Sequence, residues 1–100
     1  MRELTTAVKE EIENIVYDFF AENCEFEREK ITSETNVIDD LDGDSLMLLE
    51  LLESLSQKYG LNIEMQVIGL YLLQHPATTI GDIIELSYAI YQKENNLVEE

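Results

Sequence analysis

The chain has 100 residues, of which 45% are hydrophobic, so we expect one small folded domain rather than a disordered chain. Its net charge is −16, from 22 acidic and 6 basic residues. This charge argues against nucleic acid as a partner, because phosphate binding depends on Lys and Arg, and against anionic membrane surfaces.

The first two predicted helices start at hydroxyl or acidic residues. Apolar residues recur at helical spacing from about residue 6 to 24, and either Thr5 or Thr6 can cap the start of that helix. Cys24, the only cysteine, lies at its end, so no intramolecular disulfide can form. We expect a buried, unreactive thiol there. A second helix is predicted over residues 45–58, with Gly60 as its stop.

Two shorter helical patterns follow. One lies between residues 64 and 75 and ends at Pro76, which disfavours helix in the residue before it. The other starts at TIGD, where Thr79 can cap the backbone and Asp82 can reach back in a capping box. We expect the polar tail, residues 94–100, to be frayed.

These patterns predict an all-α fold with no strand, a small antiparallel four-helix bundle. The whole chain, 1–100, is expected to be a single domain with its folded part at about 5–93. A long connection, residues 25–44, joins the first two helices. Because apolar residues recur along it, we expect it to be ordered and tied to the core by Phe26, Ile31, Val37, Ile38 and Leu41.

The second helix has two distinct faces on a helical wheel. The predicted core arc consists of Met47, Leu48, Leu51, Leu52 and Leu55. The opposite arc consists of Leu46, Leu49, Glu50, Glu53 and Gln57. Two leucines among acids are typical of a small contact surface with a charged rim. The alternative interpretation is a helix slightly more apolar than it needs to be.

Four aspartates precede this helix in the segment DDLDGD, residues 39–44. Their alternation suggests calcium ligands, but the glycine and glutamate of a calcium loop do not fall in register. Ser45 follows at the first helical position, with Asp44 as N-cap. A helix start favours an attached phosphate, whereas Asp42 and Asp44 would repel it toward solvent. The pattern therefore suits an attachment point, although a serine that merely helps to cap the helix is the alternative.

Sequence features of an enzyme are lacking. His75 is the only histidine and precedes a helix-ending proline, so we expect a turn residue. The sequence has no Ser–His–Asp ordering, metal-ligand cluster or phosphate-binding glycine loop. We therefore expect neither catalytic residues nor a metal site. The N-terminus lacks a signal-peptide core and no apolar run reaches membrane-spanning length, so we expect a cytoplasmic protein without membrane insertion.

The segment DGDSLMLLELL resembles the Asp-Ser-Leu signature of acyl carrier proteins. Three other segments are similar to that family in the same order: ITSETNVIDDL before the signature, YGLNI after the second helix, and TTIGDIIELS at the last helix. Asp-Ser-Leu alone is a weak motif. Together with its flanking matches, which extend over roughly residues 5–91, the resemblance is specific.

The resemblance implies that Ser45, flanked by Asp44 and Leu46, carries a covalent 4′-phosphopantetheine taken from coenzyme A by a phosphopantetheinyl transferase. The arm would carry acyl groups as thioesters between enzymes of fatty-acid, lipid or polyketide-type biosynthesis. Acyl-loading, condensing or acyl-transferring partners with basic docking patches would contact the second helix, and we expect a monomer. The implied partner-recognition residues are Asp42, Asp44, Leu46, Leu49, Glu50 and Glu53.

Some residues depart from the usual pattern of the family. Met47 stands where fatty-acid carriers often have an acid, and SLSQKYG ends the second helix with few acids. The third helical segment is longer and more apolar than usual, and LLQHPATTI is similar to a turn of polyketide and peptide-synthetase carriers. These departures favour a specialised, free-standing carrier. The alternative from a different class is an unmodified helical adaptor, which would need neither Ser45 nor the acidic loop.

Overall fold

The computed structural model describes residues 3–93, and at Ser45 it describes the backbone alone. Four α-helices and one short 3-10 helix follow one another along the chain: α1 (Thr6–Asn23), η1 (Arg28–Lys30), α2 (Ser45–Tyr59), α3 (Met65–Gln74) and α4 (Ile80–Lys93). Within the described residues no strand forms, and the only bridge is an isolated pairing of Asn36 with Thr79. The expected small, all-helical bundle is confirmed. The predicted tail, 94–100, lies outside the described residues.

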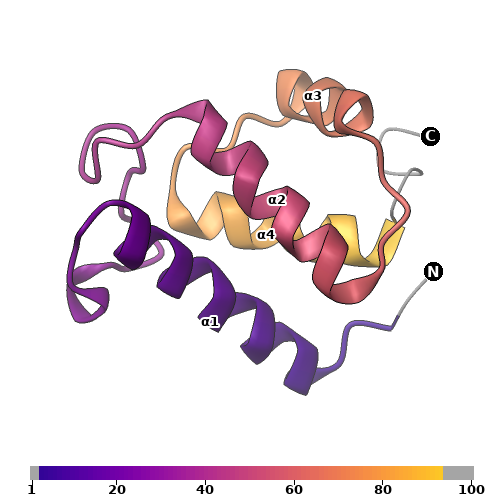
Figure 1. Ribbon diagram of the computed structural model, residues 1–100, viewed down its shortest axis with the longest axis horizontal. Helices are drawn as coiled ribbons and strands as arrows, with labels where there is room; N and C mark the ends of the chain where they lie inside the picture. The colour runs from indigo at the N-terminus through magenta and orange to yellow at the C-terminus, as the bar shows by residue number, and fades with distance from the viewer. Residues whose placement is uncertain (1–2, 94–100) are drawn as a thin grey trace.

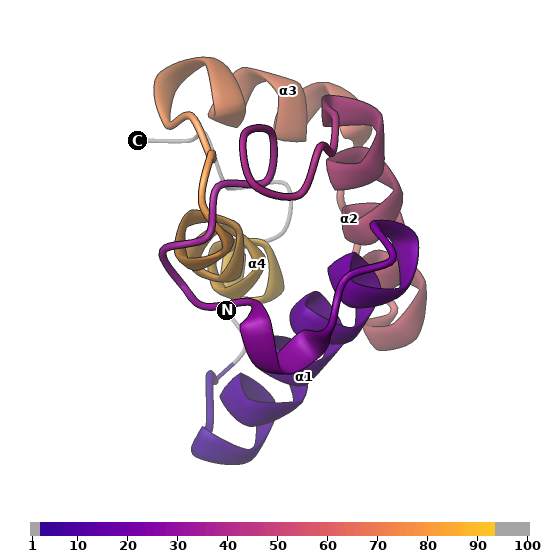
Figure 2. The same cartoon turned by 90° about the vertical axis from the view of Figure 1, so that its left-hand side faces the viewer.

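The helices are arranged around α4, which packs against α1 and α2. In Figure 1, α1 runs in the direction opposite to both α2 and α4. The short α3 lies on the other side of α2 and α4 from α1, and the quarter turn in Figure 2 shows the same order. Its core contact is limited, since Ile68 is the one fully buried residue among the ten of α3. The bundle is therefore antiparallel between α1 and its two neighbours.

Each long helix starts at a side chain that accepts a backbone N–H. Thr5 Oγ1 accepts from Val8 N–H at 3.2 Å, which settles the first cap in favour of Thr5. At α4, Thr79 Oγ1 accepts the N–H of Asp82 at 3.1 Å, and the Asp82 carboxylate accepts the N–H of Thr79 at 3.2 Å. This is the predicted capping box. At the other end of α2, Gly60 has φ +62° and closes the helix in the left-handed conformation.

The core is formed by one side of each helix and by part of the long loop. It contains Ile12, Val16, Phe20, Ile31, Val37, Leu41, Leu48, Leu51, Leu52, Leu55, Ile68, Ile80, Ile83, Ile84, Leu86 and Ile90. Three of the expected loop anchors, Ile31, Val37 and Leu41, are among them. The other two anchors were predicted wrongly, because Phe26 is 37% exposed and Ile38 is 52% exposed. Ile38 lies within a turn and Phe26 directly follows one, so neither is held in a regular element that packs on the bundle.

The long loop is attached to the start of α4 by backbone hydrogen bonds. Val37 N–H donates to Thr78 O at 3.0 Å, Ile80 N–H to Thr35 O at 2.9 Å, and Gly81 N–H to Ser33 O at 2.8 Å. Paired backbone groups of this kind are what an ordered loop requires. The connection that leads into α2 is therefore held against α4.

Candidate functional site at the start of α2

The first turn of α2 is fixed by the residue that precedes it. Asp44 is the N-cap, with extended backbone angles (φ −142°, ψ 175°), and its Oδ1 accepts the N–H of Met47 at 3.0 Å. Ser45 is consequently the first helical residue, as the sequence predicted. A residue at this position projects from the positive end of the helix dipole, beside backbone N–H groups that lack partners within the helix.

The acidic segment before Asp44 is a tight, hydrogen-bonded loop. The side chain of Asn36 accepts the N–H groups of Ile38 and Asp39, both at 2.9 Å, and Asp40 in turn accepts the N–H of Asn36 at 2.8 Å. Asp42 then adopts a left-handed conformation with φ +56°. These contacts turn the chain so that the aspartates are exposed while Val37 and Leu41 are buried.

Gly43 allows this loop to lie close to the core. Its N–H donates to Val37 O at 2.8 Å. A Cβ at this position would lie 2.8 Å from Val37 Cγ1 and 3.3 Å from Met47 Sδ, inside normal contact distances. Only a residue without a side chain lets the loop approach this closely. Neither Gly43 nor Val37 was predicted as a site residue; the glycine between two aspartates was the available signal.

The residues around Ser45 are mostly exposed. Asp42, Asp44, Glu50 and Glu53 all face solvent, and Leu46 is 62% exposed. Leu49 differs from its prediction, because it is only partly exposed and packs against the core. Leu49 also lies three residues before the fully buried Leu52, which places it at the edge of the buried face. The exposed surface near the start of α2 thus combines acids with one largely exposed leucine, Leu46.

Cys24 lies beneath this site without being part of it. It is half-buried at the end of α1, with its Sγ 3.8 Å from Met47 Sδ. Burial raises the pKa of the thiol, and the nearby charges of Asp42 and Asp44 raise the pKa further. Because the thiolate is the nucleophilic form, this environment favours an unreactive cysteine. Its burial is less complete than the sequence suggested.

Other chemical groups do not assemble into a reactive centre. His75 ends α3 and is exposed, and its ring lies against that of Tyr71 with centroids 4.6 Å apart. Across residues 3–93, no three His, Cys, Asp or Glu side chains are grouped so that they could hold a metal ion. None of the helices in that part of the chain is long and apolar enough to cross a membrane.

Comparison with known proteins identifies the class to which this arrangement belongs. Residues 14–86 match the family model described as a phosphopantetheine attachment site. The acyl carrier protein homolog of Clostridium acetobutylicum is 52% identical over 97% of this chain and 94% of its own length. The acyl carrier proteins of Lactobacillus acidophilus and Lactobacillus johnsonii are 40% and 38% identical, each over 55% of this chain and 69% of its own length. No solved structure matches at the same level of significance.

The chain is therefore a non-enzymatic carrier built around a phosphopantetheine attachment site. It belongs to the acyl carrier protein family, as the motifs of the sequence predicted, and its cofactor is phosphopantetheine. Acyl-handling enzymes and a phosphopantetheinyl transferase are the partners that membership of this family implies.

Proposed function

We propose that Ser45 is the residue that carries the 4′-phosphopantetheine arm. The observation that carries this proposal is the place of Ser45 in the fold: it is the first residue of α2, directly after the N-cap Asp44 and within the segment that matches the attachment-site family. Transfer would form an ester bond between the serine oxygen and phosphorus and would break the pyrophosphate bond of coenzyme A, with adenosine 3′,5′-bisphosphate as the leaving group and with release of the serine hydroxyl proton.

The surroundings of Ser45 fit a charged group that stays at the surface. A phosphodiester carries negative charge, which the N-terminal N–H groups and dipole of α2 stabilise. The exposed carboxylates of Asp42 and Asp44 repel the same charge and so direct it away from the protein. When bound, the arm supplies a thiol on which an acyl group can be held as a thioester.

We further propose that α2 is the surface that partners recognise. Leu46 supplies apolar contact, Glu50 and Glu53 supply charge, and Asp42 and Asp44 continue the acidic surface past the attachment point. Leu49 would contribute to this surface only through the part of its side chain that is exposed. Rim charges mainly raise association rates, which suits a carrier that must bind and leave many enzymes. The partners would be acyl-loading, condensing or transferring enzymes of fatty-acid, lipid or polyketide-type biosynthesis, in the cytoplasm.

The attachment proposal is tested by intact mass. The full chain is incubated with coenzyme A and a broad-specificity phosphopantetheinyl transferase, and its mass is compared with that of the Ser45→Ala variant. We expect the wild type to gain the mass of one phosphopantetheine group and the variant to gain none.

Ser56→Ala is a matched control, since Ser56 lies on the same helix and its hydroxyl donates to Leu52 O at 3.0 Å. We expect this variant to be modified like the wild type. A wild type that stays unmodified by several transferases would favour the other interpretation, an unmodified helical adaptor. Modification of Ser45→Ala would place the arm elsewhere.

A further inference from the structure

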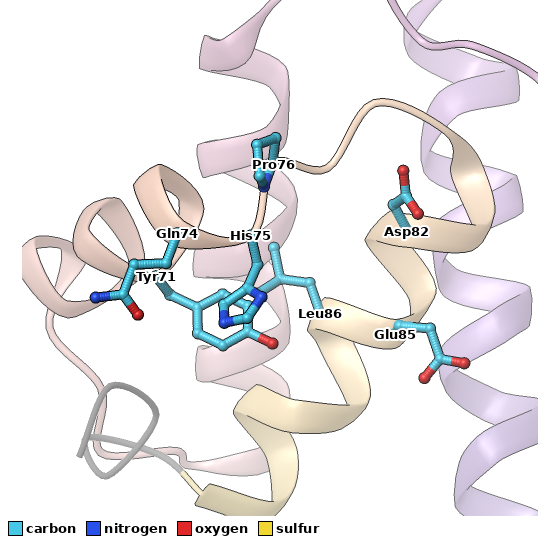
Figure 3. Close-up of a pocket in the computed structure, with 7 residues that line it drawn as sticks. All are labelled: Tyr71, Gln74, His75, Pro76, Asp82, Glu85 and Leu86. Atoms are coloured by element: carbon cyan, nitrogen blue, oxygen red, sulfur yellow. The ribbon is translucent and has the colours of Figure 1, made fainter. Parts of the chain in front are cut away.

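A groove lies between the end of α3 and the first turns of α4, away from the residues proposed for attachment and docking. Its volume is about 360 Å³. It is lined by Tyr71, Gln74, His75, Pro76, Asp82, Glu85 and Leu86. In Figure 3 the rings of Tyr71 and His75 lie together on the α3 side, and the carboxylates of Asp82 and Glu85 extend from α4 on the other side. The groove thus combines aromatic surface with two acids.

The aromatic side of the groove is a pair of contacting rings. The centroids of Tyr71 and His75 are 4.6 Å apart, with 32° between the ring planes. Tyr71 is partly buried and His75 is exposed, so the pair is anchored on the bundle at one end and open to solvent at the other. Exposed ring faces of this kind attract cations through their quadrupole.

The acidic side of the groove has unused hydrogen-bonding capacity. Asp82 uses its Oδ2 to accept the N–H groups of Thr78 and Thr79, and these bonds lower the pKa of its carboxyl group. Its Oδ1 accepts no hydrogen bond within residues 3–93. Over the same residues Glu85 accepts no hydrogen bond and forms no ion pair. Two exposed carboxylates therefore lie on the α4 side of the groove, and no cationic side chain of residues 3–93 lies between them.

Among residues 3–93, no lysine or arginine lines the groove. Lys9 and Lys93 lie in the adjacent hollow, which shares Tyr71 and Glu85 with it, but neither ammonium group is within ion-pair distance of Glu85. Within residues 3–93 no cationic group occupies this position, and in a chain with net charge −16 the acids of the groove are free to attract a cation from another molecule.

We propose that this groove binds an arginine side chain presented by a partner protein. A guanidinium group is planar, so it can stack on the Tyr71–His75 pair while its N–H groups donate to Asp82 and Glu85. A lysine ammonium can satisfy the charge but cannot stack in the same way. The site is a second contact surface, distinct from α2, and it does not depend on the arm at Ser45.

Apolar residues next to the groove indicate what surrounds that arginine. Leu73 is 81% exposed and Leu70 is 46% exposed, and Leu70 lies one turn from Gln74 on the same helix. The segment Met65–Gln74 contains no charged residue. A partner segment with an apolar residue beside the arginine would cover these leucines, whereas a purely basic segment would leave them in water.

The proposal can be tested with short blocked peptides and the full chain. Gly-Arg-Gly, Gly-Lys-Gly and Gly-citrulline-Gly are titrated separately at pH 8 while the backbone amide shifts of the protein are recorded. We expect the arginine peptide to shift the amides around Tyr71, His75 and Glu85 in a saturable manner. Its affinity there should exceed that of the lysine peptide by about threefold, and the neutral citrulline peptide should not bind.

The molecule offers an internal control for simple charge attraction. Glu50 and Glu53 line a hollow of about 240 Å³ on α2, with Ser54 and Gln57 and without any aromatic ring. We expect the arginine and lysine peptides to affect that hollow equally and weakly. Equal shifts in both hollows, equal affinity of the two cationic peptides for the groove, or no saturable binding there would overturn the proposal.

Two variants separate the parts of the site. Glu85→Gln removes one charge with little change of shape and should weaken arginine binding at the groove about threefold, whereas Glu53→Gln should leave it unchanged. His75→Ala removes exposed ring surface and should abolish the preference for arginine over lysine. Neither Glu85→Gln nor His75→Ala should alter modification at Ser45, so failure of one proposal is distinguishable from failure of the other.

Discussion

At the scale of single residues, the geometry around Ser45 depends on two small features of the preceding loop. The Asp44 carboxylate starts the helix, and Gly43 allows the backbone to contact Val37. The cap was predictable because capping depends on the local sequence. The requirement for glycine was not, because it arises from Val37 and Met47, whose positions depend on how the loop folds over the core.

A substitution at Gly43 tests this dependence. In Gly43→Ala the new Cβ would lie 2.8 Å from Val37 Cγ1, so the loop must shift, and we expect the free energy of unfolding to fall by about 1–3 kcal/mol. The measurement is urea unfolding followed by circular dichroism.

Gly69→Ala provides the contrast, since a Cβ at that position of α3 meets nothing within 4 Å. Alanine is the better helix former, so we expect this variant to be about 0.5–1 kcal/mol more stable than the wild type. If the two substitutions changed the free energy of unfolding equally, the close approach of the backbone at Gly43 would not contribute to stability.

At the scale of helices, the sequence predicts where each helix starts and ends better than it predicts how deeply individual residues are buried. The ends of α2 and α4 follow from Asp44, Gly60 and the Thr79–Asp82 pair, all of which act within one turn. Burial depends on neighbours that are distant in sequence, and for that reason Phe26, Ile38 and Leu49 were misplaced. The groove between α3 and α4 also escaped prediction, because it depends on how a loosely packed helix lies against another.

The capping box of α4 makes a prediction about acid. In Asp82→Ala the N–H groups of Thr78 and Thr79 lose their acceptor. We therefore expect the free energy of unfolding to fall by about 1 kcal/mol at neutral pH. Hydrogen bonds from those N–H groups lower the pKa of Asp82 in the folded state below its ordinary 3.8. The ionised carboxylate therefore stabilises the fold fully above that ordinary value, and its contribution is lost as the pH falls through the lowered folded pKa.

The measurement is urea unfolding of wild type and Asp82→Ala between pH 7 and pH 2. The difference in free energy of unfolding between the two proteins should stay constant down to about pH 4–5 and shrink below that pH. Glu22→Ala, at an exposed position on α1, should show no comparable pH dependence. A difference that persists unchanged at pH 2 would contradict the assigned role of the carboxylate.

At the scale of the whole molecule, charge is unevenly distributed. The ion pairs within the described residues include Arg28–Asp18 and Lys30–Glu27, which lie at the long loop and the end of α1. From Ile31 to Gln57 the sequence has no basic residue. The attachment site and α2 thus lie in an uncompensated negative region, and such a region steers cationic surfaces toward it.

Charge reversal on α2 should therefore slow docking. We expect Glu50→Lys/Glu53→Lys to reduce the association rate with a phosphopantetheinyl transferase by about tenfold or more at low salt, with unchanged helical content. Stopped-flow binding and circular dichroism measure the two quantities.

Glu10→Lys/Glu22→Lys has the same net charge but changes exposed acids on α1. We expect it to slow association much less, since those residues lie outside the proposed docking surface. Equal slowing by the two double variants would mean that net charge alone, and not the face of α2, governs the encounter.

The hydrogen bonds that hold the acidic loop also define a path for mechanical force. Tension on a group attached at Ser45 would pass through Asp44 and Gly43 to Val37, and from Val37 N–H to Thr78 at the start of α4. The load thus enters the best-packed helix of the bundle, while α3 lies off this route. An enzyme that draws the arm into its own active site would therefore pull against the core of the bundle.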